Sequence, residues 1–203
     1  MVHISNQLLS FEDFLAQYGD DFRYELVDGE LLEMELTGPH EMVAGKIAMR
    51  VAREIDRLGN PWFVPRSCIL RPFSGVATAR RPDVAIVDES ALTEEPLWEY
   101  EPVITQGKSI PLVVEVVSTN WENDYARKLE EYALFWILEY WIVDFRGLVG
   151  VAYIGRPKQP TFTVCQLVGE DYEQRQFRLT EPIVSPLFPA LDFTLQDLMP
   201  RKN

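Results

Sequence analysis

The sequence has few residues that could form disulfides, bind a structural metal ion or anchor the chain in a membrane. Its 203 residues include two cysteines, Cys68 and Cys165, which lie far apart without a CxxC or Cys/His spacing. This usage argues against a disulfide framework and a structural zinc site, and it favours a reducing, cytoplasmic location. No apolar run is long enough to span a bilayer, and residues 1–10 lack the features of a secretory signal. We therefore expect a soluble intracellular protein with no membrane partner.

Basic residues are also scarce. Lysine and arginine number 19 against 32 aspartates and glutamates, so the formal net charge is −13. A surface this acidic does not bind nucleic acid passively, but it does not exclude a nucleic-acid enzyme whose cleft is locally basic or metal-loaded. Four arginines bracket a strand-like run that starts at residue 83: Arg66, Arg71, Arg80 and Arg81. They either contact phosphates or offset the acidic surplus, and both interpretations stay open.

The chain does have enough apolar residues for one sizeable core. Hydrophobic residues make up 47% of the sequence, and no internal repeat, low-complexity tract or linker interrupts it. A chain of this length and composition is typical of one soluble globular domain. We therefore expect a single domain over residues 1–203.

Strand-like and helical patterns follow each other along the chain. Strand-like runs at residues 23–27 and 30–35 flank Asp28 and Gly29, which is a strong hairpin signal. Apolar spacing and capping signals predict helices after Ser10 and over residues 41–58, 121–138 and 194–199, the third with Asn120 as its cap and Trp136 in its apolar stripe. Further strands are expected at residues 62–70, 83–87, 111–117 and 140–145, with a long acidic loop over 88–110 and a β-rich tail over 149–185. The expected architecture is a mixed α/β (α+β) sheet with helices packed on it.

Two acids interrupt the aliphatic strands. Glu115 lies inside the run over residues 111–117, where a carboxylate is costly unless it is paired, hydrogen-bonded or bound to a metal. Asp83 opens the other aliphatic strand, and in an antiparallel pair the two acids meet at one edge of the sheet. A cation resolves the repulsion between them, and oxygen ligands suit Mg²⁺ or Mn²⁺. The structural alternatives are a glutamate paired with an arginine and a strand-start cap after Pro82.

Lys128 is the third candidate. It lies four residues after Asp124 and four before Tyr132, so it borders the buried face of the predicted helix. That helix follows the Glu115 strand across a short connection, and a lysine side chain is long enough to reach back to the carboxylates. An exposed ion pair with Asp124 accounts for the spacing equally well.

These residues, taken in order, resemble a known family. The corresponding motifs are YELVDGEL at residues 24–31, His40, RPDVAIV at 81–87, VEVVS at 114–118, Asp124, Lys128, Tyr132 and EYWIVD at 139–144. Together they resemble the Uma-type restriction endonuclease family of the PD-(D/E)xK nuclease superfamily, over residues 11–193. Each motif is short, but their order and spacing are fairly specific.

The resemblance implies a restriction-endonuclease-like fold, a mixed sheet flanked by helices, and Mg²⁺-dependent (or Mn²⁺-dependent) hydrolysis of DNA phosphodiester bonds. The positions that hold the metal in that superfamily correspond here to Asp83 and Glu115, and the backbone carbonyl of Val116 is a further ligand. This sequence departs from the superfamily pattern at Val117, where the lysine of the Glu-x-Lys motif is expected. Lys128 resembles the migrated lysine that some branches carry on the following helix.

The resemblance also covers two residues outside these strands. Glu25 matches a recurrent family glutamate and is expected in the same catalytic cleft, although a surface position on the hairpin fits strand alternation as well. His40 matches another family position and is expected to line the cleft.

Three classes of function stay open. The first is a metal-dependent DNA endonuclease with Asp83, Glu115, Lys128 and Glu25 as catalytic residues. The second is a catalytically inactive nuclease-fold protein that acts as a binding or assembly module, which the net charge of −13 and Val117 favour. The third is a carboxylate-pair hydrolase such as a glycosidase, which needs no metal.

A homodimer is also expected, because a twofold axis places two copies of one site on the two strands of a duplex. Aromatic residues make up 12% of the sequence, and Trp62, Trp98 and Trp141 lie outside the clearest helical stripe. These residues either contribute to a partner surface or are covered by the β-rich tail of the same chain.

Overall fold

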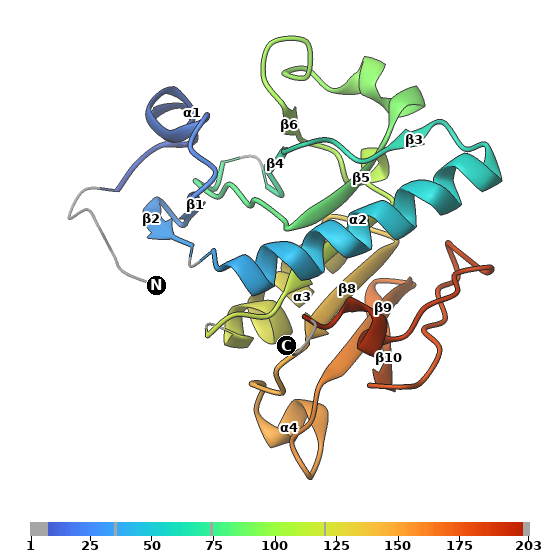
Figure 1. Cartoon of the computed structure of the whole chain (residues 1–203). Coiled ribbons are helices and arrows are strands. Elements are labelled where there is room, and N and C mark those ends of the chain that lie inside the picture. Colours follow the sequence, from blue (N-terminus) through green and yellow to red (C-terminus); the bar gives the residue numbers. More distant parts are fainter. Residues whose placement is uncertain (1–7, 35, 74, 120, 201–203) are drawn as a thin grey trace.

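A six-stranded mixed sheet forms the centre of the molecule (Figure 1). The computed structural model describes residues 8–34, 36–73, 75–119 and 121–200. The strand order is β10-β9-β8-β7-β5-β3, in which β7 and β8 are parallel and the other neighbouring pairs are antiparallel. The strands are β3 (Trp62–Phe63), β5 (Val84–Asp88), β7 (Leu112–Val116), β8 (Glu139–Asp144), β9 (Thr161–Val168) and β10 (Asp171–Arg178). The expected mixed α/β sheet is confirmed.

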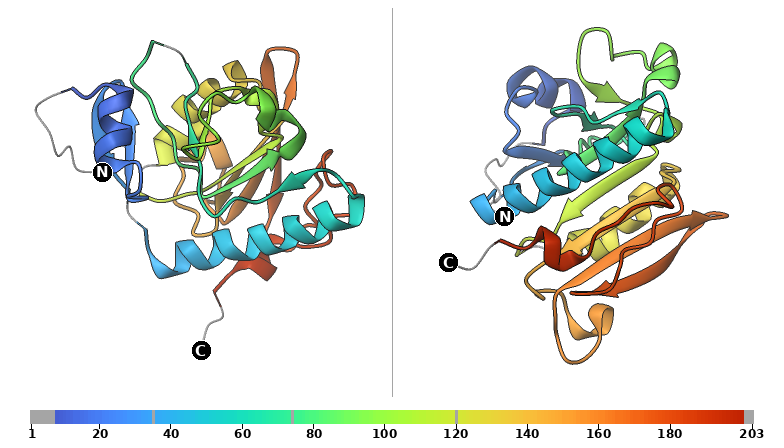
Figure 2. Two further views of the ribbon diagram at one scale, coloured as in Figure 1. Left: turned by 90° about the horizontal axis from the view of Figure 1, so that it is seen from above. Right: turned by 45° about the vertical axis from the view of Figure 1, so that its right-hand side comes forward.

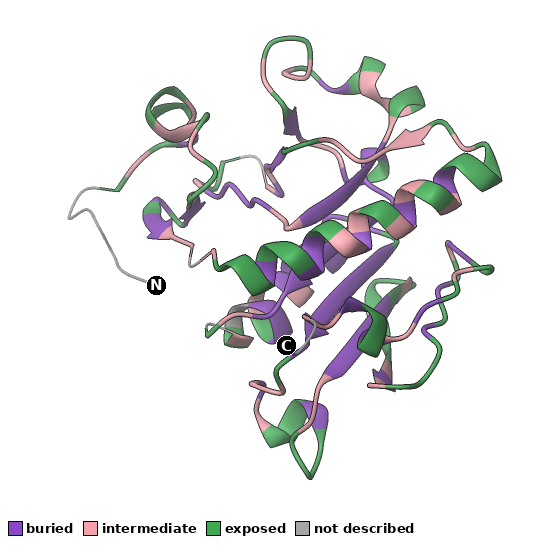
Figure 3. Cartoon of the chain, in the orientation of Figure 1, coloured by how far each residue is buried: buried purple, intermediate pink, exposed green. Residues whose placement is uncertain are grey.

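Helices cover both faces of this sheet, as Figure 2 shows. The long helix α2 (Gly38–Leu58) packs on one face, and α3 (Lys128–Leu134), which continues the π-helical turn η3 (Asn123–Arg127), packs on the other. Successive residues of a strand point to opposite faces, so Val114 belongs to the core under α2 and Val113 to the core under α3. The central strands are buried on both sides (Figure 3), which explains their nearly continuous aliphatic sequence.

A smaller unit of structure lies beside the start of β5. It contains α1 (Phe11–Tyr18), the hairpin of β1 (Tyr24–Val27) and β2 (Glu30–Glu33), and the parallel pair of β4 (Ile69–Leu70) and β6 (Val103–Ile104). Asp28 and Gly29 have φ angles of 51° and 83°, as the expected hairpin turn requires. An isolated bridge from Leu26 to Ala79 ties the hairpin to the chain that leads into β5.

The remaining elements are short. They are the 3₁₀ helices η1 (Glu89–Glu94) and η2 (Gly107–Ser109), and the helices α4 (Val151–Ile154) and α5 (Leu195–Leu198). The expected irregular loop over residues 88–110 is thus more ordered than its sequence indicates, because it contains η1, β6 and η2. In the part of the chain that the structure describes, no helix is both long and apolar enough to cross a membrane.

Two predicted boundaries were wrong near the first long helix. The helix begins at Gly38, not at residue 41, because Pro39 is accepted in the first turn, where a missing N–H costs no helical hydrogen bond. The single strand expected over residues 62–70 is divided into β3 and β4, which belong to different sheets. Pro65 interrupts the backbone donors between them.

The helix expected to end at residue 138 ends at Leu134. Trp136 adopts a left-handed φ of 65°, its amide donates to the Ala133 carbonyl, and the Ile137 amide donates to the Tyr132 carbonyl. This pair of hydrogen bonds is a Schellman motif with Trp136 at the position that usually holds glycine. Trp136 is 56% exposed, so its expected place in the apolar stripe was wrong.

The aromatic residues discussed for a partner surface differ in burial. Trp141 is fully buried, and its ring packs against Phe162 and Phe188, which belong to β9 and to the chain after β10. The tail of the same chain therefore covers it, and Trp141 contributes no partner surface.

Some sequence expectations lie outside the described residues. They concern the Asn120 cap, Glu35 at the end of the second hairpin strand, and residues 1–7, where no secretory signal was expected.

Candidate active site

Asp83 and Glu115 lie at the same edge of the sheet. In the antiparallel pair of β5 and β7, Val84 is opposite Val114, so one residue further along the register Asp83 stands beside Glu115. The Val116 amide donates a 2.6 Å hydrogen bond to Asp83 Oδ2, which fixes the aspartate against the end of β7. β5 and β7 are therefore antiparallel neighbours, which is the condition under which the two acids were expected to meet at one edge.

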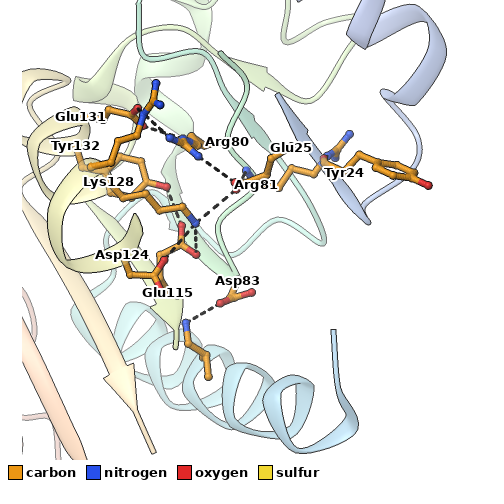
Figure 4. A network of polar contacts seen from close by, with 12 residues as sticks. Tyr24, Glu25, Arg80, Arg81, Asp83, Glu115, Asp124, Lys128, Glu131 and Tyr132 are labelled. Atoms are coloured by element: carbon orange, nitrogen blue, oxygen red, sulfur yellow. Dashed lines mark hydrogen bonds and ion pairs between the residues drawn. The ribbon is translucent and has the colours of Figure 1, made fainter. Parts of the chain in front are cut away.

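Lys128 lies at the centre of a cluster of carboxylates (Figure 4). Its Nζ is 2.9 Å from Glu115 Oε2, and it is 3.6 Å from both Asp124 Oδ1 and Glu25 Oε1. The i,i+4 pair with Asp124 exists, but the Lys128 side chain is only 7% exposed, so the pair is not a solvent-exposed surface contact. The ammonium of Lys128 therefore faces the acids of the sheet edge.

Glu25 comes to this cluster from the hairpin. It is buried, and its two carboxylate oxygens accept hydrogen bonds from the Arg81 amide at 2.9 Å and from Arg80 Nη1 at 3.2 Å. The surface position on the hairpin is thus excluded, because the Leu26–Ala79 bridge turns this side of β1 toward the chain that leads into β5.

Behind Glu25 lies a buried ion-pair network. Arg80 is fully buried and makes hydrogen bonds of 2.8 and 2.9 Å to the two oxygens of Glu131, and Arg127 Nε also donates to Glu131 at 2.7 Å. A fully buried guanidinium that is held by two carboxylates cannot reach solvent, and removal of either partner would leave an uncompensated buried charge. Of the two interpretations of this arginine, contact with phosphates is therefore wrong for Arg80.

Two of the other candidate arginines also have internal partners. Arg81 donates to the carbonyls of Tyr18, Gly19 and Tyr24, and Arg71 pairs with Glu12 at 3.2 Å. Arg71 and Arg81 thus join the N-terminal elements to the part of the chain beside the sheet edge.

His40, in the first turn of α2, lies against the same edge. Its Nε2 is 2.8 Å from the Val116 carbonyl oxygen and 3.3 Å from Asp83 Oδ2. Burial acts to lower the pKa of His40, but the contacts with Asp83 and the Val116 carbonyl raise it to about 9. His40 therefore lies buried against the sheet edge that holds Asp83 and Val116, and its place in a catalytic cleft stays a prediction.

The electrostatics of the cluster reflect a surplus of acids. Burial raises the pKa of Glu115 to about 8 and that of Asp124 to about 6, against the attraction of the Lys128 ammonium. Burial also acts to raise the pKa of Glu25, but Lys128 and Arg80 lower it overall. Acids that share too few cations hold their protons more tightly, and an added cation at this edge would relieve that repulsion.

Tyr132 is a member of the site whose polar role the sequence analysis missed. Its hydroxyl donates a 2.8 Å hydrogen bond to Glu115 Oε1. The signal was present, because Tyr132 lies one helical turn after Lys128 and so faces the same acids. Arg80 and Glu131 were missed as a pair because they are far apart in the sequence, and only the fold brings them together.

The site offers oxygen ligands for a metal. In the described ranges, no group of three histidine, cysteine, aspartate or glutamate side chains is arranged to hold a metal ion. What the sheet edge presents is two carboxylates, Asp83 and Glu115, and the carbonyl of Val116. This set fits Mg²⁺, which usually binds one or two carboxylates and completes its shell with water.

Comparisons with known proteins agree on the fold. The crystal structure of a protein described as "a putative nuclease belonging to DUF820" from Anabaena variabilis ATCC 29413 superposes with a TM-score of 0.66 at 14% sequence identity. The match covers 94% of this chain and 97% of that one. A search of curated protein sequences finds no significant match. The family model described as "Uma2: Putative restriction endonuclease" matches residues 11–196. The chain therefore belongs to the Uma2 family, a family of nuclease-like proteins.

Proposed function

We propose that this protein is a Mg²⁺- or Mn²⁺-dependent endonuclease that hydrolyses phosphodiester bonds of DNA. One observation carries the proposal: the Lys128 amine lies 2.9 Å from Glu115, at the sheet edge that also holds Asp83. Although Val117 occupies the motif position of the lysine, the helix after β7 supplies an ammonium at the same edge. The parts that metal-assisted phosphoryl chemistry needs are thus together.

Each residue has a distinct role in this proposal. Asp83, Glu115 and the Val116 carbonyl would hold the metal, which when bound would supply a Lewis acid for the scissile phosphate and for a water molecule. Lys128 orients the attacking water or stabilises the negative charge that develops on the phosphate. Glu25 contacts Lys128 at 3.6 Å and acts by positioning its amine.

The two proposed metal ligands other than Asp83 already have hydrogen-bond or ion-pair partners in the structure. The Val116 carbonyl accepts from His40, and Glu115 accepts from both Lys128 and Tyr132. A carbonyl oxygen has two lone pairs and a carboxylate about four acceptor sites, so each group retains acceptor capacity beside its present partner. The residues therefore remain suited to the metal.

A specific observation favours the second candidate, a catalytically inactive nuclease-fold module for binding or assembly. In such a protein the Glu115–Lys128 ion pair replaces the metal, because one ammonium satisfies the carboxylate that a metal would otherwise hold. The net charge of −13 points in the same direction.

Cleavage assays separate these candidates. We expect the purified protein to nick or linearise plasmid DNA with Mg²⁺ or Mn²⁺ and to lose this activity in EDTA, and we expect Asp83→Asn to be inactive. The exposed aspartate of β10 gives the control Asp171→Asn, which should cleave like the unaltered protein. If DNA stays intact with either metal, the binding module is favoured. Hydrolysis of a glycoside that EDTA leaves unchanged would favour the carboxylate-pair hydrolase.

A further inference from the structure

Two adjoining cavities meet at Asp83. Their volumes are about 330 and 510 Å³, and they share the wall residues Glu41, Arg66, Ser67, Cys68, Pro82 and Asp83. The smaller cavity continues along α2 past Gly45 and Ala48. The larger cavity extends toward the end of α1 and the hairpin. Its volume lies within the range of about 300–1,000 Å³ that is typical of small-molecule sites.

The larger cavity has an apolar wall. Phe22, Met34 and Leu36, which flank the hairpin strands, line it, and Phe22 is 61% exposed. Near this wall, Arg81 donates to the Tyr18 and Gly19 carbonyls at the end of α1, and the Met34 amide donates to the Arg23 carbonyl at 2.7 Å. An exposed aromatic ring beside aliphatic side chains is the kind of surface on which a nucleobase stacks.

Arg66 differs from the other arginines near the site. It is exposed and lines both cavities, and among the residues that the structure describes it makes no hydrogen bond or ion pair. A guanidinium without an internal partner at the junction of two cavities is suited to one phosphate group. Asp20 and Glu41 also line the larger cavity, and their charge opposes a run of several phosphates there.

We propose that the larger cavity binds one unpaired nucleotide next to the scissile phosphate, with its base on the wall of Phe22, Met34 and Leu36 and its phosphate on Arg66. The inference rests on the proposed nuclease function, because that function places the scissile phosphate at Asp83. The nucleotide comes either from a single strand or from a base turned out of a duplex, since both present the same free base face and phosphate.

Binding measured without metal tests the cavity separately from catalysis. In EDTA, the fluorescence anisotropy of a short labelled single strand should show that Phe22→Ala weakens binding roughly tenfold, as loss of one base–aromatic stack does. Arg66→Gln should weaken binding and reduce the salt dependence by about 0.7 in the log–log slope, which corresponds to one phosphate contact. The matched controls are Tyr100→Ala, which removes an 80% exposed aromatic, and Arg53→Gln, which removes an exposed arginine of α2 outside both cavities.

The two sources of the nucleotide are distinguished with a duplex that carries 2-aminopurine. A rise in its emission that Phe22→Ala abolishes indicates a base turned out of the duplex, and binding of the single strand alone indicates a single-stranded substrate. Either result supports the cavity when Phe22→Ala and Arg66→Gln also weaken binding relative to the controls. If Phe22→Ala and Arg66→Gln bind both DNAs as the controls do, the inference is overturned, even if the protein cleaves DNA with Mg²⁺. If the binding pattern holds but no metal supports cleavage, the nuclease proposal fails and the nucleotide site stands.

Discussion

The acids of the site surround the Lys128 ammonium, and we expect removal of this ammonium to slow DNA cleavage. Lys128→Met keeps most of the side-chain length but leaves Glu115, Asp124 and Glu25 without their shared ammonium. We expect the rate of DNA cleavage to fall by roughly a hundredfold or more, the scale of a lost charge-stabilising group. The rate is measured under single turnover with Mg²⁺.

The control for this change is Lys108→Met, which removes an exposed lysine paired with Glu94. Circular dichroism of both variants monitors folding, since burying unpaired acids also lowers stability. A folded Lys128→Met protein that cleaves as fast as the control would show that Lys128 has only a structural role.

Glu139 gives a prediction about pH. Burial raises the pKa of this carboxyl above its usual value near 4.5, although Trp141, Ser185 and the Leu187 amide donate to it. An acid with a raised pKa in the folded state stabilises the fold most at low pH, and this contribution is lost as the pH rises through the raised pKa. The free energy of unfolding of the unaltered protein should therefore fall, relative to that of Glu139→Gln, as the pH rises from 4.5 toward neutrality.

Urea denaturation at several pH values measures this difference. Because glutamine does not ionise, its variant serves as the reference at each pH. A difference that stays constant or changes in the opposite direction would contradict the assigned pKa shift.

The end of α3 is the element whose geometry conflicts most with its sequence. Trp136 occupies the left-handed position of the Schellman motif, which costs a residue with a side chain about 1 kcal/mol relative to glycine. Trp136 is 56% exposed, and the indole ring is absent from both Trp136→Gly and Trp136→Ala, so its lost contacts cancel in the comparison. We expect Trp136→Gly to have a free energy of unfolding about 1 kcal/mol above that of Trp136→Ala. Equal thermal and urea stabilities of these two variants would argue against backbone strain at this position.

The elements also show what a sequence can predict. Alternation and aliphatic runs predicted β5, β7 and β8, because buried strands leave a local pattern. The hairpin followed from Asp28 and Gly29 between two strand-like runs. The helix end at Leu134 was missed because a tryptophan at a left-handed position leaves no local signal.

The site was predictable to a similar degree. Asp83 and Glu115 were identified because acids in aliphatic strands are anomalous, and Lys128 because of its helical spacing from Asp124. The partners of Arg80 were not, since Glu25 and Glu131 reach it from distant parts of the chain. Burial decides between a surface arginine and a core arginine, and burial here depends on the tertiary fold.

At the scale of the whole molecule, the homodimer remains a prediction. Trp141 no longer supports it, but Leu134, Trp136 and Leu138 near the end of α3 are at least half exposed. Exposed apolar side chains close together in sequence are suited to an interface core. Light scattering at micromolar concentration should give twice the chain mass of 23.5 kDa. A mass equal to one chain at that concentration would contradict the dimer.

The central claim is that Asp83 and Glu115 bind a divalent cation at the edge of the sheet. Titration calorimetry with Mn²⁺ tests it most directly, because binding is measured without substrate or turnover. The account predicts one Mn²⁺ per chain, with affinity at least about tenfold weaker in Asp83→Asn and unchanged in Asp171→Asn. If Mn²⁺ binds equally to the unaltered protein and to Asp83→Asn, or does not bind at all, the proposed metal site is wrong.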